Sequence, residues 1–108
     1  MIITTTPYLD GYKIKKVIGL VHAFSIRTRG LGGQITGGVE SIFGGKITAY
    51  ESEMKKTRDE VLKKLEKEAE KKGANAIIGI DLETTNISPT HPAIVLSAWG
   101  TAVVLENK

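Results

Sequence analysis

The sequence contains no cysteine, and this absence excludes several classes of protein. Disulfide scaffolds, thiolate zinc sites, iron–sulfur clusters and cysteine nucleophiles all require that residue. A chain of 108 residues without such cross-links depends on its hydrophobic core, or on a partner subunit, for stability. Because a chain of this length forms one core, we expect a single domain over residues 1–108.

Long apolar runs and aromatic residues are also scarce. No stretch approaches the roughly 18 apolar residues of a membrane-spanning helix, and the first residues lack the features of a signal peptide. We therefore expect a cytoplasmic protein. Aromatic residues make up only 6% of the chain, and the excess of basic residues is spread over residues 10–46. This pattern argues against nucleic-acid binding, which favours a dense basic stripe with interleaved aromatic residues.

A long amphipathic helix is the clearest element that the sequence does contain. Thr48 and Glu51 have the spacing of a capping box, and Gly73 supplies a left-handed stop. These signals predict a helix from Ala49 to Lys72. Its buried stripe is predicted from residues that recur at spacings of three and four, namely Tyr50, Met54, Thr57, Val61, Leu65 and Ala69.

Three long strands are predicted around this helix. Residues Tyr12 to Arg27, Ala76 to Thr85 and Ala93 to Glu106 are rich in strand-forming side chains, and the last two are expected to form an antiparallel hairpin. Residues 2–6 are a candidate short strand, and residues 34–43 a candidate short helix. The predicted fold class is therefore α+β, an antiparallel sheet of three or four strands with one long amphipathic helix.

The predicted strands are apolar on both faces. Over residues 93–106, the odd-numbered and the even-numbered positions are both apolar or small. One helix covers only one face of such a sheet, and the second face would expose more apolar surface than soluble monomers tolerate. We expect a second copy of the chain to cover that face. The alternative is that residues 30–45 fold over it.

The glycine-rich stretch before the helix invites comparison with a phosphate-binding loop. The segment from Gly45 to Thr48 has one residue too many before its hydroxyl group to match that loop. Lys46, beside a helix N-terminus expected at Thr48, is nevertheless a candidate anion site and would suit an enzyme with an anionic substrate. A simple connection, or close packing between subunits, explains the glycines more readily.

The remaining polar candidates are few. His22 lies in an apolar row, which favours a core or interface histidine, whereas His91 lies in the polar connection of the hairpin. Asp81 shares a strand face with Glu83, but two carboxylates are too few for a hard cation. Arg58 lies on the flank of the helical stripe, where it either extends to solvent or pairs with Asp81 at an interface. No triad or general acid–base pair can be assembled from these residues without assuming a fold.

Four segments of the chain resemble the YbjQ-like family, whose uncharacterised bacterial and archaeal members are labelled heavy-metal-binding. They are residues 4–7, 44–51, 73–81 and 97–103, so the resemblance spans essentially the whole chain. It implies a fold similar to the dodecin subunit, with a β-α-β-β core, and assembly into a ring that is typically a pentamer. The family carries no established catalytic residues. Within these segments, Trp99 stands where a small residue is usual in the family.

We therefore expect a non-enzymatic, ring-forming homo-oligomer that binds a small ligand or ion between its subunits, without a cofactor. The alternative is a heavy-metal-binding or metal-stress protein, although the absence of cysteine leaves no visible soft-metal site. The candidate ligand or interface residues are His22, Lys46, Arg58, Asp81 and Trp99.

Overall fold

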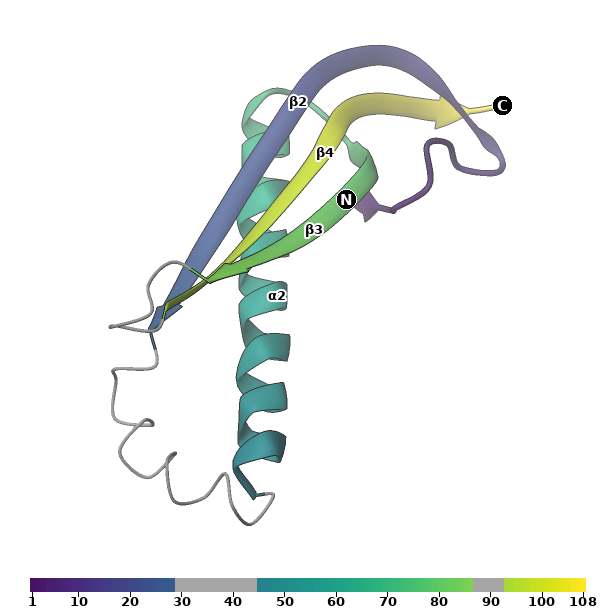
Figure 1. Cartoon of the computed structure of the whole chain (residues 1–108). Coiled ribbons are helices and arrows are strands. Elements are labelled where there is room, and N and C mark those ends of the chain that lie inside the picture. Colours follow the sequence, from purple (N-terminus) through teal and green to yellow (C-terminus); the bar gives the residue numbers. More distant parts are fainter. Residues whose placement is uncertain (29–44, 87–92) are drawn as a thin grey trace.

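The computed structural model describes residues 1–28, 45–86 and 93–108, which form a two-layer α+β unit (Figure 1). One long helix lies along one face of a four-stranded sheet. The predicted helix 34–43 and the connection 87–92 fall outside the described residues. The described elements, in chain order, are β1 (Ile2–Ile3), β2 (Tyr12–Thr28), α2 (Gly45–Lys71), β3 (Ala76–Asn86) and β4 (Ala93–Asn107).

The strand order in the sheet is β1-β3-β4-β2. Strand β4 pairs antiparallel with both β2 and β3, which confirms the three long strands and the hairpin. The prediction of an entirely antiparallel sheet is wrong, because β1 runs parallel to β3. The two isoleucines of β1 do not indicate from sequence whether the strand runs parallel or antiparallel to its neighbour. Their direction depends on bonds to the edge of β3, such as the one from the Thr4 N–H to the Ile77 carbonyl at 3.0 Å.

The C-terminus of α2 follows the prediction, and its N-terminus does not. At the end of the helix the Gly73 N–H donates to the Glu70 carbonyl, and the Ala74 N–H donates to the Ala69 carbonyl, both at 3.0 Å. Together with a φ of +89° at Gly73, this is a Schellman motif. The helix begins at Gly45, so Thr48 lies within it and the predicted capping box is wrong. The helix can extend back to Gly45 because residues 46–72 contain no glycine or proline, the residues that most disfavour a helix.

The predicted helical stripe forms the core from Thr57 to Ala69, whereas Met54 is only partly buried and the side chain of Tyr50 lies outside the described residues. Val61, Leu65 and Ala69 are fully buried, and Thr57 is buried beside them. They pack against one face of the sheet, which supplies Val21, Ala23, Ile77, Ile80, Leu96, Ala98 and Ala102. A smaller cluster of β3 and β4 residues packs against Ile2, Leu9 and Tyr12, and its members are Ala76, Ile78, Val103 and Leu105.

The protein is elongated for its length. Its Cα radius of gyration is 17.3 Å, whereas a compact domain of about 100 residues has a radius near 13 Å. Residues 51–53, 55 and 56 of α2 are exposed, and among the helical side chains from residue 51 onward Thr57 is the first that is fully buried. Within the described residues, no helix has both the length and the apolar composition of a membrane span. The single chain thus encloses a small core and leaves much of its surface uncovered.

Gly100 provides a test of the core. A Cβ atom at this position would lie 2.5 Å from Cγ2 of Ile77, which is fully buried. We therefore expect Gly100→Ala to lower the free energy of unfolding by about 1–3 kcal/mol, the usual cost of overpacking. Chemical denaturation at a fixed protein concentration measures this change. The control Lys63→Ala, at an exposed helical position, should stay within about 0.5 kcal/mol of the wild type, and an equal effect of both variants would contradict the packing argument.

Candidate functional site

The face of the sheet turned away from α2, here called the open face, carries large apolar side chains. On β2, Leu20, Phe24 and Ile26 are 66%, 50% and 51% exposed, while the alternate residues Val21 and Ala23 are buried under the helix. The predicted second apolar face is therefore present in the folded chain. Cross-strand register places on it Leu20, His22, Phe24 and Ile26 of β2, Val95, Ser97, Trp99 and Thr101 of β4, and Asp81, Glu83 and Thr85 of β3.

A short row of stacked rings occupies the centre of the open face. His22 lies directly opposite Trp99 in the β2–β4 register, and their ring centroids are 5.0 Å apart at an interplanar angle of 22°. The His22 ring also stacks on Phe24, with centroids 5.9 Å apart. Of the two positions expected for His22, the core of the single chain is excluded, because the residue is exposed on the open face, and an interface position remains a prediction. The strand alternation that buries Val21 and Ala23 turns His22 outward.

The open face changes from apolar to acidic across the sheet. Asp81 pairs in register with Trp99, and Glu83 pairs with Ser97, so both carboxylates lie on β3 beside the aromatic row. Both residues are exposed, and neither forms an ion pair with the described residues. Asp81 and Glu83 therefore form an acidic border of the open face along β3.

Arg58 and Lys46 lie on the helical layer, away from the open face. The Arg58 guanidinium is exposed and donates to the Asp59 carboxylate at 3.2 Å. Since α2 and Asp81 are on opposite faces of the sheet, an Arg58–Asp81 pair needs a second copy of the chain. Lys46 belongs to the first turn of α2, and its side chain lies outside the described residues. The N-terminus of the helix lies at Gly45 and not at Thr48, where the candidate anion site was expected.

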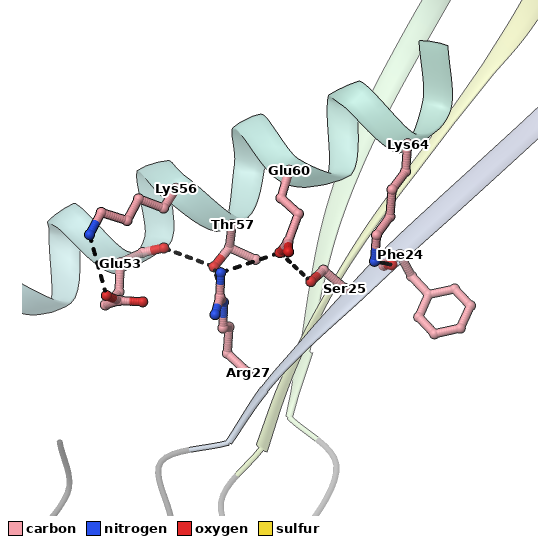
Figure 2. Close-up of polar contacts among 8 residues, drawn as sticks. All are labelled: Phe24, Ser25, Arg27, Glu53, Lys56, Thr57, Glu60 and Lys64. Carbon is pink, nitrogen blue, oxygen red and sulfur yellow. Dashed lines mark hydrogen bonds and ion pairs between the residues drawn. The ribbon is translucent and has the colours of Figure 1, made fainter. Parts of the chain in front are cut away.

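A set of polar contacts joins the helix to the end of β2, and we call it the polar seam (Figure 2). The Ser25 hydroxyl donates to Oε2 of Glu60 at 2.7 Å, and Nη2 of Arg27 approaches the same oxygen at 3.3 Å. Nε of Arg27 donates to the Thr57 hydroxyl at 2.8 Å, which in turn donates to the Glu53 carbonyl. The seam therefore fixes the middle of α2 against β2.

Lys64 of α2 and Lys72, the residue that follows the helix, extend these contacts along the outer edge of β2. Nζ of Lys64 donates to the Phe24 carbonyl at 3.1 Å, and Nζ of Lys72 donates to the Leu20 carbonyl at 3.3 Å. The eight residues from Lys64 to Lys72 rise about 12 Å at helical spacing, and the four residues from Leu20 to Phe24 span about 13 Å of strand. The spacing of the two lysines therefore matches that of the two carbonyls. These carbonyls would otherwise lack a partner strand, because β2 is the last strand of the described sheet.

Glu60 is the one described acid whose titration the seam alters. The hydrogen bond from Ser25, followed by the positive charges of Arg27 and Lys64, holds the pKa of Glu60 below its usual value. Partial desolvation of the carboxylate opposes this shift. The carboxylate is thus stabilised in its charged form by the contacts that attach the helix to β2.

A hollow of about 520 Å³, for which no sequence pattern was a signal, lies near the C-terminal end of α2. Its lining comes from four separate parts of the chain, so no local pattern could have revealed it. One carboxylate, one phenol and one amide are the polar side chains in it. The lining residues are Met1, Ile2, Tyr12, Glu70, Ala74, Asn75 and Leu105.

The donor set for a heavy metal is absent from the described part of the chain. Residues 1–28, 45–86 and 93–108 contain no group of three or more His, Asp or Glu side chains placed to hold an ion. His22 is stacked between rings, and Asp81 lies two strands away from it across the sheet. His91 falls outside the described residues. These side chains do not fit a soft metal, which prefers thiolate or clustered imidazole ligands.

Comparison with known proteins identifies the family. Residues 1–106 match the model of the YbjQ family, which is described as "Putative heavy-metal-binding". A UPF0145 protein of Thermoplasma volcanium is 39% identical over 107 residues, which cover 99% of this chain and 86% of that one. A UPF0145 protein of Halalkalibacterium halodurans is 37% identical over the full length of both chains. The chain therefore belongs to the YbjQ (UPF0145) family.

A solved structure supports the fold. The crystal structure of a protein of unknown function of the DUF74 family from Pediococcus pentosaceus has a TM-score of 0.65 and covers 98% of both chains. At 23% sequence identity, this similarity shows that the two chains share a fold.

The lowered pKa of Glu60 predicts how stability depends on pH. The folded chain holds this proton less readily than the unfolded chain, so the stabilisation is complete above the ordinary glutamate pKa of about 4.3. It is lost as the pH falls through the lowered value in the folded state. Between about pH 5 and pH 3, the wild type should therefore lose more thermal stability than Glu60→Gln, as measured by circular dichroism. Glu66→Gln, on the same helix and outside the seam, should follow the wild-type profile; identical profiles for all three chains would contradict the role of Glu60.

Proposed function

We propose that this member of the YbjQ family is a non-enzymatic subunit of a cytoplasmic, homo-oligomeric ring that binds a small ligand or ion between its subunits. The open face is the observation that carries this proposal. Three large side chains of β2 are at least half exposed on it, beside the stacked rings of His22 and Trp99. A second copy of the chain is the simplest cover for such a face.

The size of the uncovered apolar surface favours association of copies. Apolar surface contributes roughly 25 cal/mol per Å² when it leaves water, and soluble monomers rarely expose contiguous patches of more than a few hundred Å². Strand β2 alone exposes Ile14, Val17, Leu20, Phe24 and Ile26. Association of copies removes this surface from water. The expected ring of five subunits follows from the family resemblance described above.

A ligand between subunits would meet both kinds of surface that the open face offers. The stacked rings of His22, Phe24 and Trp99 provide flat apolar area, and Asp81 provides a negative charge one strand away. This combination favours a small planar or positively charged ligand. The one described hydroxyl bonded to a carboxylate, that of Ser25 on Glu60, lies on the helical side of the sheet and not on the open face, which favours binding over catalysis at this face.

Heavy-metal binding is the second candidate function, and the description of the family is what favours it. The described side chains do not supply a suitable donor set. Calorimetric titration of the full chain with Zn²⁺, Cu²⁺ and Ni²⁺ separates the two proposals. We expect no heat above that of dilution into buffer, whereas saturable binding of a metal at a fixed number of ions per chain would favour the metal-binding function.

Assembly is tested by light scattering coupled to size-exclusion chromatography at micromolar concentration. The wild type should have several times the 11.7 kDa mass of one chain, and Phe24→Asp/Ile26→Asp should have the mass of a single chain. Both side chains are exposed in the isolated chain, so the variant should keep its helical circular dichroism. Lys63→Asp/Lys67→Asp, on exposed positions of α2, is the control and should assemble as the wild type does. A monomeric wild type would refute the proposed ring.

A further inference from the structure

We propose that neighbouring copies join edge to edge: residues 13–17 of β2 in one copy pair with residues 81–85 of β3 in the next. This inference rests on the proposed ring and identifies the surfaces that form it. It follows from which parts of the two outer edges of the sheet are closed within the chain and which parts are left open.

The outer edge of β2 is partly closed, and only over its C-terminal half. Lys64 of α2 and Lys72, which follows it, donate to the backbone carbonyls of Phe24 and Leu20. The polar seam holds the side chains of Ser25 and Arg27 against the helix over the same part of the strand. N-terminal to Leu20, no hydrogen bond from a described helical residue reaches β2. Residues 13–17 are all exposed and therefore form an open stretch of strand edge.

The opposite edge of the sheet is closed over its other half. Here β1 and the residues after it cover the start of β3: the Ile80 N–H donates to the Thr4 carbonyl at 3.1 Å, and the Gly79 N–H donates to the Thr6 carbonyl at 2.8 Å. Beyond Ile80, none of the described residues bonds to this edge. Residues 81–85 are all exposed, Leu82 among them, so they form a second open stretch of similar length.

The two open stretches carry opposite charges. Lys15 and Lys16 lie on the β2 stretch and form no ion pair with the described residues, as is also true of Asp81 and Glu83 on the β3 stretch. Pairing two β2 stretches would place lysines side by side, and pairing two β3 stretches would place carboxylates side by side. Both like-charge contacts are unfavourable across neighbouring strands, whereas pairing of β2 with β3 is favourable.

Contact between two different edges is head-to-tail, which is the kind of contact that generates a ring when the rotation closes. Strand addition of this kind satisfies backbone groups that an exposed edge leaves unpaired. Sheets joined in this way also turn all their open faces to the same side. The arrangement therefore links the charged edges to the burial of Leu20, Phe24 and Ile26.

Charge exchange across the two edges tests this inference. Lys15→Glu/Lys16→Glu and Asp81→Lys/Glu83→Lys should each dissociate the assembly to single chains by light scattering at micromolar concentration. The chain that carries all four substitutions should assemble again, because attraction is restored with the signs reversed. Asp59→Lys/Glu70→Lys, which adds the same charge at exposed helical positions, is the control for net charge and should assemble as the wild type does.

A proline at the open edge of β3 provides a test that is independent of charge. Thr84→Pro removes a backbone N–H group from the edge strand, where an isolated chain tolerates proline. We expect wild-type circular dichroism with loss of assembly. An assembled wild type together with assembled double variants and assembled Thr84→Pro would refute edge pairing and leave the proposed ring standing. A monomeric wild type would refute the ring and edge pairing together.

Discussion

One helix packed against one face of a sheet is the constraint on which the rest of this structure depends. Val61, Leu65 and Ala69 bury their side chains completely, but they can cover only the residues of β2 and β4 that point toward the helix. The strands carry apolar side chains on both faces, and the described chain has no second layer for the other face. The proposed assembly, the position of the aromatic row and the elongated shape all follow from this imbalance.

The polar seam solves a second problem that the same arrangement creates. A helix on one face leaves the outer edge of β2 with unpaired carbonyl groups, which are costly if they lack partners and prone to aggregation if they are exposed. Lys64 and Lys72 supply donors to two of these groups, and Glu60 holds Ser25 and Arg27 in place. Each surface contact of this kind contributes little alone. Together they determine where the helix lies and which part of the edge remains open.

The features that were predictable from the sequence are those with local causes. The Schellman motif at Gly73 needs only neighbouring residues, and the buried stripe through Val61 and Leu65 needs only helical periodicity. The features that were missed depend on contacts between distant segments. The partner of Glu60 is Ser25, thirty-five residues away, and the direction of β1 depends on bonds to β3. The sequence could not decide between a core and an interface position for His22, because periodicity reveals an apolar row without revealing which side the helix covers.

The open face also bears on how binding and assembly are related. A ligand held between copies, at the rings of His22 and Trp99, binds the assembled state and has no complete site on the single chain. By mass action, such a ligand stabilises the state to which it binds, in proportion to the logarithm of its concentration relative to its dissociation constant. Binding and assembly are then two measurements of one equilibrium. The proposed ligand is therefore best sought through compounds that stabilise the assembly, since the described residues contain no group of side chains placed to hold a metal ion that would identify it.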